Sequence, residues 1–268
     1  MRLLMIRHGE SVDNVAHLYA GSRDSPLTTH GALQADRLAS SFARSVKLTY
    51  IYSSPLKRAA QTAQIIHDAQ HPACLNVIRV EELREKHFGS AEGQSYRAKD
   101  PFLQNGPCLP EAAESNDSMN ARMHSFFNRH LAPLLHRECE SGQEMTCAIV
   151  SHGIILSVLY KVLSTKISRV TTPEVLSAKS DANVPPVCPS WSNTGFLDVT
   201  LSRSNPSSPL VLCISSVNCT LHLANLRKTR GGIGSAPLDQ RQRTIRHFFT
   251  PKSRQDATFE KDGTSNHV

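Results

Sequence analysis

The sequence predicts an α/β fold: a three-layer α/β/α sandwich with a mostly parallel central sheet, followed by a disordered C-terminal tail. Short apolar runs of strand length alternate with segments whose apolar residues recur every three or four positions, as on one face of a helix. This alternation is typical of a parallel sheet that helices cover on both faces. The 268 residues also suffice to bury one sizeable core.

The strands are predicted from apolar runs that end at polar or turn-forming residues. Four of these runs lie in the first 150 residues, and two more follow a stretch rich in Ser and Pro between Pro173 and Pro189, which we interpret as a loop. The expected strands span residues 3–6, 48–52, 75–80, 147–150, 195–201 and 210–217.

The helices are predicted from apolar spacing and from residues that can begin a helix. Thr28 can cap one helix, and Ser54 can cap another that has Pro55 at its first position. Pro133 should kink or divide a third, because proline lacks the N–H that a helix interior needs. A short helix is also expected from Ser11. The longer helices are expected at 29–43, 56–66, from about Asn116, and 154–163.

Charge divides the chain into two parts. From Arg203 onward ten Lys and Arg residues face four Asp and Glu, whereas residues 1–202 carry twenty against nineteen. The sequence therefore predicts a domain over residues 1–226 and a disordered basic tail over residues 227–268.

Composition excludes several classes of protein. No apolar run approaches the roughly 18 residues of a membrane span, and the N-terminus does not have the pattern of a signal peptide. The seven cysteines are scattered and never spaced as CxxC, which disfavours a disulfide framework and a zinc site. We therefore expect reduced thiols, and a cytoplasmic or also nuclear location.

Residues that could bind and cleave a phosphate ester follow several predicted strands. Ligands of open α/β sheets bind beyond the carboxyl ends of the strands. Arginines bind phosphate oxygens, an imidazole can attack phosphorus, and a carboxylic acid can protonate the leaving oxygen. Each residue alone would suit an ordinary surface or core position, so the prediction depends on their joint occurrence. These residues are Arg7, His8, Arg58, Glu85 and His152.

Four segments carrying these residues resemble the motifs of the histidine phosphatase superfamily, also called phosphoglycerate mutase-like. They are "LLMIRHGESVDN", "YSSPLKRAAQTA", "LREKHFGSAEG" and "IVSHG". The resemblance covers roughly residues 1–226, and the order of four motifs makes it specific. It implies a phosphoric monoester hydrolase of the histidine acid type, with small-molecule phosphate esters as substrates and no metal or organic cofactor.

The resemblance also implies roles for individual residues. His8 would be the phosphorylated nucleophile, and Glu85 the proton donor. Arg7, Arg58 and His152 would bind the phosphoryl group. Residues that match further substrate-binding positions of the family are Ser11, Asn14 and Gly153.

A phosphatase and a mutase are both represented in this superfamily. The segment "LREKHFGSAEG", which contains the predicted proton donor, is the acid motif. The resemblance associates mutases with a basic segment containing paired arginines after this motif, whereas here only isolated Arg97 and Lys99 follow it. Glu114 and Ser115 match a Gly-Gly-Glu-Ser pattern of phosphatase members, although alanines replace the glycines. The acid motif and "SNTGFLDVTL" look closest to TIGAR and fructose-2,6-bisphosphatase-type phosphatases. We therefore expect a phosphatase, with a phosphoglycerate mutase-type transferase as the alternative.

The tail contains "QRTIRHFF", residues 242–249, which fits the PIP box that binds the sliding clamp PCNA. Gln242 would bind a polar recess, while Ile245, Phe248 and Phe249 would form one hydrophobic plug. This motif predicts a function of another class, clamp binding, in which the phosphatase domain is either targeted or catalytically incidental. Direct nucleic-acid binding is disfavoured, because the aromatic residues are clustered rather than interleaved with basic ones.

Overall fold

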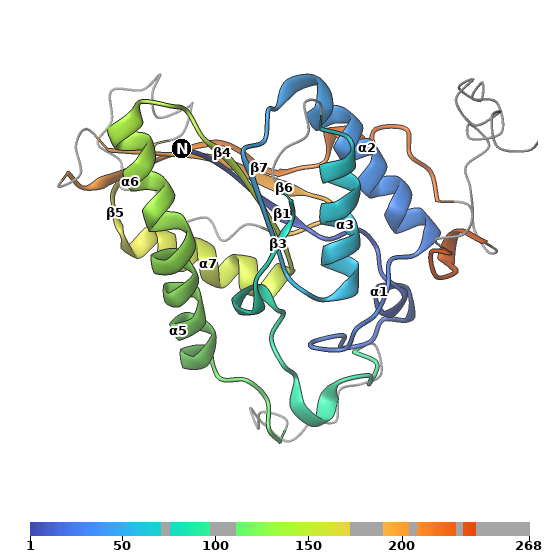
Figure 1. Cartoon of the computed structure of the whole chain (residues 1–268). Coiled ribbons are helices and arrows are strands. Elements are labelled where there is room, and N and C mark those ends of the chain that lie inside the picture. Colours follow the sequence, from blue (N-terminus) through green and yellow to red (C-terminus); the bar gives the residue numbers. More distant parts are fainter. Residues whose placement is uncertain (71–75, 97–110, 172–189, 204–207, 229–232, 240–268) are drawn as a thin grey trace, which may run out of the picture. The chain divides into compact units, whose positions relative to one another are not determined.

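The computed structural model describes residues 1–70, 76–96, 111–171, 190–203, 208–228 and 233–239. Over these residues seven strands form one sheet in the order β3-β2-β4-β1-β6-β7-β5 (Figure 1). The strands are β1 (Arg2–Arg7), β2 (Tyr50–Ser53), β3 (Ile78–Arg79), β4 (Thr146–Ser151), β5 (Ile167–Thr171), β6 (Phe196–Ser202) and β7 (Leu210–Cys219).

The sheet is mostly parallel, as predicted. β1 pairs in parallel with β4, and β2 pairs in parallel with both β4 and β3. Among the described strands, β6 alone runs against its neighbours, β1 and β7. The strand expected at 75–80 is shorter within the described residues 76–80, where the register with β2 covers 78–79. The parallel arrangement brings the carboxyl ends of β1, β2 and β4 to one edge.

Helices cover both faces of the sheet (Figure 1). Leu3 and Met5 point into a cluster with the helices α5 (Asn116–Phe126), α6 (Ala132–Ser141) and α7 (Gly153–Thr165). Leu4 and Ile6, which alternate with them along β1, point into a second cluster with α2 (Thr29–Ser45) and α3 (Lys57–Asp68). Since successive side chains of a strand point to opposite faces, β1 is buried from both sides. The three-layer prediction is confirmed.

Two helix starts differ in how well the sequence predicted them. Thr28 caps α2, as expected, and its hydroxyl accepts a hydrogen bond from the Gly31 N–H. The expected cap of the next helix was wrong: α3 begins at Lys57, and Leu56 is its N-cap. Ser54 lies before the helix, where its hydroxyl accepts from the Leu56 N–H at 3.3 Å.

The helix predicted from Asn116 is divided before Pro133. Ser115 caps α5, a π-helical segment η3 (Phe127–Leu131) follows, and Pro133 lies in the first turn of α6. In that turn the missing N–H of proline costs no intrahelical bond. The short helix expected from Ser11 is α1 (Val12–Ala16), where Ser11 and Asn14 form a reciprocal capping box.

The C-terminal part of the described chain returns to the beginning of α2. The Leu238 N–H donates to the Leu27 carbonyl, and the Thr29 N–H donates to the Ala236 carbonyl. The compact unit that contains the sheet extends from Met1 to Leu238, beyond the boundary expected at Leu226. The short 3-10 helices η4 (Leu221–Leu223) and η5 (Ile233–Ser235) lie in this part.

None of the described helices has the length and apolarity to cross a membrane. The loop expected at 173–189 and the tail from residue 240 lie outside the described residues, and the PIP-box-like segment at 242–249 lies outside them too.

Candidate functional site

The sheet brings His8 and His152 together. Arg7 at the end of β1 pairs with Ser151 at the end of β4, so that each histidine follows its strand at the same edge. Their imidazole rings lie 5.0 Å apart between centroids, with an angle of 61° between the ring planes. Both side chains are buried. The parallel register thus predicts the proximity of two residues far apart in sequence.

One hydrogen bond fixes the tautomer of His8. Its Nδ1 lies 2.7 Å from the Gly9 carbonyl, which can only accept, so Nδ1 must carry the proton. Burial lowers the pKa of His8 well below its usual value, and the positive charges of Arg58 and Arg7 lower it further. The ring is therefore neutral at physiological pH, and its Nε2 keeps a lone pair that can attack an electrophile.

Arg58, in the first turn of α3, lies against His152 in the interior. Its Nη1 donates to the Arg23 carbonyl at 2.6 Å, and its Nη2 to the Gly21 carbonyl at 2.7 Å. Its Nε donates to Nδ1 of His152 at 3.2 Å. Since a guanidinium has five N–H groups, the described contacts leave two for an anion. Burial lowers the pKa of Arg58, although the nearby Glu85, Asp13 and Asp24 oppose that shift.

His152 has the opposite tautomer to His8. Its Nδ1 accepts from Arg58, so in the neutral ring the proton is on Nε2, which lies 2.9 Å from the Ser54 hydroxyl. Burial, followed by the charge of Arg58, lowers the pKa of His152 well below its usual value. Nε2 of His8 thus keeps a lone pair, whereas Nε2 of His152 carries a proton that is directed at the Ser54 hydroxyl.

Arg7 is held by the segment before β6. Its Nη1 donates to the Trp191 carbonyl at 2.6 Å. Its Nε is buried and has no hydrogen-bond partner among the described residues. A buried guanidinium N–H without a partner is costly, and a bound phosphate oxygen would supply the missing acceptor. Burial lowers the pKa of Arg7, while the charge of Glu85 opposes that shift.

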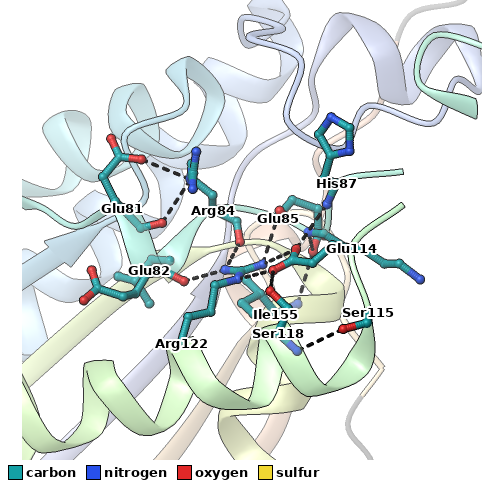
Figure 2. Close-up of polar contacts among 12 residues, drawn as sticks. Glu81, Glu82, Arg84, Glu85, His87, Glu114, Ser115, Ser118, Arg122 and Ile155 are labelled. Atoms are coloured by element: carbon teal, nitrogen blue, oxygen red, sulfur yellow. Dashed lines mark hydrogen bonds and ion pairs between the residues drawn. The ribbon is translucent and has the colours of Figure 1, made fainter. Parts of the chain in front are cut away.

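The Glu85 carboxylate lies at the N-terminus of α7, the helix that begins directly after His152 (Figure 2). Its Oε1 accepts from the backbone N–H groups of Lys86 and Ile155, at 2.9 and 3.2 Å. Its Oε2 accepts only from the Ile154 N–H among the described residues, at 3.2 Å. Since a carboxylate oxygen has two acceptor positions, Oε2 keeps one at which a proton can reside.

Gly9 permits a close approach of two backbones. A Cβ built on it would lie 2.5 Å from the Gly31 carbonyl oxygen, at the start of α2. The Gly9 N–H donates to the Thr62 hydroxyl at 3.1 Å. The loop after β1 is therefore held tightly between α2 and α3, and His8 with it.

The other predicted substrate-binding residues surround this loop. The hydroxyl of Ser11 accepts from the Asn14 N–H, and Asn14 Oδ1 accepts from the Ser11 N–H, so both side chains cap α1. Asn193 donates to Asn14 Oδ1 at 3.2 Å and to the His8 carbonyl at 3.1 Å. Gly153 is the first residue of α7. Their binding of substrate stays a prediction.

Sequence reasoning missed contributors that act through long-range contacts. Ser54 was interpreted as a helix cap, but its hydroxyl faces His152. The Trp191 carbonyl accepts from Arg7, and the Asn193 side-chain amide donates to the His8 carbonyl; contacts to backbone carbonyls leave no pattern in the sequence. Arg122 contacts the segment around Glu85 and had no local signal. The tail residues proposed to bind a partner, Gln242, Ile245, Phe248 and Phe249, lie outside the described residues. No group of three or more metal-binding side chains is present in the described ranges.

Comparison with known proteins gives a consistent result. The family described as the histidine phosphatase superfamily (branch 1) matches residues 3–178. A protein of Schizosaccharomyces pombe that is named as a probable phosphatase is 34% identical over 248 residues, which cover 91% of this chain and 78% of the relative. Phosphoglycerate mutase-like protein 4 of Arabidopsis thaliana is 30% identical over 169 residues, which cover 59% of this chain and 69% of that protein.

Solved structures include a mutant phosphoserine phosphatase from Entamoeba histolytica in complex with phosphoserine. It matches with a TM-score of 0.55 and 25% identity, and the match covers 83% of this chain and 98% of that chain. The similarity therefore extends over most of the sheet domain.

Proposed function

The chain belongs to the histidine phosphatase superfamily, and we propose that it hydrolyses small-molecule phosphomonoesters through a phosphohistidine formed on His8. The observation that carries this proposal is the hydrogen bond from His8 Nδ1 to the Gly9 carbonyl, because it leaves Nε2 with a free lone pair. The nucleophile lies beside buried cationic and polar N–H groups of Arg7, Arg58 and His152 that suit a phosphoryl group.

In the first step, Nε2 of His8 attacks phosphorus in line with the leaving oxygen. The P–N bond forms as the P–O bond to the leaving group breaks. Arg7 and Arg58 stabilise charge on the equatorial oxygens, and the Nε2 proton of His152 joins them when a phosphoryl oxygen replaces the Ser54 hydroxyl as its acceptor. Protonated Glu85 gives its proton to the leaving oxygen, so that an alcohol departs rather than an alkoxide.

In the second step, water attacks the phosphohistidine from the side that the alcohol has left. Glu85, now a carboxylate, takes a proton from this water. The P–N bond breaks, inorganic phosphate is released, and His8 returns to its neutral form. Glu85 is protonated again, so the cycle consumes only the ester and water.

The similarities bear on the type of reaction and on the class of substrate. The Schizosaccharomyces pombe relative, which aligns over most of this chain, is named for phosphatase activity, and this favours hydrolysis over phosphoryl transfer between substrates. The mutase-like name of the Arabidopsis thaliana relative keeps a phosphoglycerate mutase-type reaction as the alternative. Within the phosphatases, the acid motif from Leu83 favours a sugar bisphosphate such as fructose-2,6-bisphosphate.

The test is phosphate release by the full-length protein from fructose-2,6-bisphosphate, 2,3-bisphosphoglycerate, 3-phosphoglycerate, phosphoserine and an aryl phosphate. His8→Ala should lower kcat/KM by at least about 10³-fold, since it removes the attacking atom. It should keep the fold, as circular dichroism would show. Acid-labile phosphate trapped on the wild type and absent from His8→Ala would support the intermediate. Wild-type turnover by His8→Ala would refute it.

A second candidate function rests on the sequence of the tail. We propose that residues 242–249 bind a sliding clamp of the PCNA type, through Gln242 and the apolar plug of Ile245, Phe248 and Phe249. The basic residues around this segment would attract an acidic clamp surface. Such binding would place a pool of the protein in the nucleus.

The full chain can be titrated against purified clamp by calorimetry. Binding that is lost in a Phe248→Ala/Phe249→Ala double variant would support the tail motif. His8→Ala, which alters the catalytic residue alone, should bind as the wild type does. No binding at high micromolar concentration would remove this candidate.

A further inference from the structure

Arg122 on α5 holds the chain segment that carries Glu85 (Figure 2). Its Nη1 donates to the carbonyl of Glu82 and, at 2.6 Å, to the carbonyl of Arg84. Its Nη2 lies 3.4 Å from the carbonyl of Glu85 itself. One guanidinium therefore contacts the backbone at three of the four residues from Glu82 to Glu85, although it lies far away in sequence.

Glu114 aligns the guanidinium of Arg122 for these contacts. Arg122 Nε lies 2.8 Å from Glu114 Oε1, and Nη2 lies 2.9 Å from Oε2, so the pair is bidentate. Both side chains are only 14% exposed. Although burial alone would raise the pKa of Glu114, the hydrogen bonds and charge of Arg122 bring it below its usual value. Glu114 is thus charged at neutral pH.

Glu114 also reaches the other side of Glu85. Its Oε2 accepts from the His87 N–H at 3.3 Å, and Oε1 accepts from the Ser118 hydroxyl at 3.1 Å. The pair of Arg122 and Glu114 therefore contacts the backbone both before and after Glu85. From the sheet side, the Ser151 hydroxyl donates to the Leu83 carbonyl at 2.7 Å.

The segment has little regular structure of its own. It consists of a 3-10 helix, η1 (Glu81–Leu83), followed by residues without helix or strand up to a second one, η2 (Gly89–Ala91). Arg84 and His87 have side chains that are 49% and 48% exposed. A backbone of this kind keeps one conformation only where contacts from outside fix it.

We propose that Arg122, aligned by Glu114, is a positioning residue that holds the Glu85 carboxyl where it can protonate the leaving oxygen. This inference rests on the proposed phosphatase function and assigns a role within it. Arg122 would not touch the substrate. Its effect would pass through the backbone from Glu82 to Glu85, so it should concern the proton transfer rather than the binding of phosphate.

The leaving group separates these two possibilities. An alkyl phosphate releases a strongly basic alkoxide and needs the proton of Glu85 as the P–O bond breaks. Nitrophenolate is a far weaker base and departs with little need of a proton. A misplaced Glu85 should therefore slow cleavage of phosphoserine much more than that of p-nitrophenyl phosphate. A general loss of structure would slow both equally.

The experiment measures kcat/KM for both esters with the full-length wild type, Arg122→Met, Arg122→Lys and Glu114→Gln. Because kcat/KM ends at the first irreversible step, it reports transfer to His8 and not later hydrolysis. We expect Arg122→Met to lower the value for phosphoserine by about 10- to 10²-fold. The value for p-nitrophenyl phosphate should stay within about 3-fold, and Arg122→Lys should recover part of the loss.

Two further variants give the largest and the smallest difference between the two substrates that the experiment should show. Glu85→Gln removes the proton itself and should show the same substrate difference at its largest. Arg129→Met is the matched control, because Arg129 bonds the Glu82 side chain at 3.3 Å, is 72% exposed, and has no bond to the backbone of this segment among the described contacts. It should leave both substrates unchanged. Thermal unfolding of each variant identifies loss of fold, and Glu114→Gln provides a milder substitution should Arg122→Met unfold.

Equal losses for both esters in folded Arg122 and Glu114 variants, or no loss, would overturn the positioning role while leaving the phosphatase intact. The absence of His8-dependent hydrolysis of either ester by the wild type would overturn the proposed function and the positioning role with it.

Discussion

The two halves of the candidate site are held in different ways. The half that would bind the phosphoryl group lies at the ends of paired strands and the start of α3, and consists of Arg7 and the buried residues His8, Arg58 and His152. The half that would supply the proton, Glu85 and its neighbours, lies on a partly exposed segment that is contacted by Arg122 of α5 and by Glu114, just before that helix. Parallel strand pairing fixes the first half, whereas one bidentate ion pair contributes to fixing the second.

This difference indicates how the two halves should respond to substitution. Substitution of a buried group at the sheet edge should lower activity by removing its charge or disturbing its packing, because strand pairing keeps the backbone itself in place. The segment that carries Glu85, here called the acid segment, should instead tolerate substitution of its exposed side chains. Its function should depend on the few residues whose contacts hold its backbone. The following predictions test that contrast, from the largest expected effect to the smallest.

Arg58→Met should have the largest effect. It removes a guanidinium that contacts His152 and would bind the phosphoryl group, and we expect kcat/KM to fall by about 10²- to 10³-fold for alkyl and aryl phosphates alike. Arg84→Met, in the acid segment, is the matched control, since Arg84 is 49% exposed and its side chain bonds only Glu81 among the described contacts. Equal losses in the two variants would break the contrast between the halves.

Gly9→Ala should have an intermediate effect. The added methyl would lie 2.5 Å from the Gly31 carbonyl, so the loop must shift, and we expect the free energy of unfolding to fall by about 1–3 kcal/mol. Gly153→Ala is the comparison, because its methyl would meet Trp191 only at an ordinary 3.8 Å and should change stability by less than about 0.5 kcal/mol. Urea unfolding measures both. A Gly9→Ala protein as stable as the wild type would show that this half is less rigid than the structure implies.

Acidification should affect stability before it affects the nucleophile. Burial lowers the pKa of both His8 and His152, so the unfolded chain binds protons near pH 6.5 that the folded chain does not. The free energy of unfolding should therefore decrease below about pH 6.5, by at most about 1.4 kcal/mol per pH unit for each histidine. Urea titrations at pH 7.5, 6.5 and 5.5 measure this.

Over the same range, kcat/KM should not decline through protonation of His8, because its ring stays neutral. Two results together would contradict the lowered pKa of His8 and His152. These are a kcat/KM profile whose acid limb has its midpoint near pH 6.5, and a free energy of unfolding that does not change over the same range.

The sequence predicted the part of the site that depends on the sheet. Arg7, His8 and His152 were found because they follow apolar runs, and parallel strands end at one edge. Ser54 was misinterpreted because serine before a helix commonly caps it, whereas the tertiary fold directs its hydroxyl to His152. β5 was missed because its five residues follow α7 almost directly and carry no strong apolar run. The role of Arg122 could not be found locally, since the carbonyl groups of Glu82, Arg84 and Glu85 that it contacts lie about forty residues earlier in the chain.

The strand spacing also has a consequence for the diversity of such proteins. Neighbouring strands of any sheet lie about 4.8 Å apart, and the rings of His8 and His152, which follow β1 and β4, lie 5.0 Å apart. Backbone hydrogen bonding sets the spacing of the two strand ends that carry these histidines, and substitution of the surrounding side chains hardly alters it. Descendants of one ancestral chain can therefore exchange the loops that recognise the organic part of a substrate while the spacing of the strand ends that carry the two histidines stays constant. Phosphate mimics such as vanadate should therefore bind to the site, whatever ester the surrounding loops select.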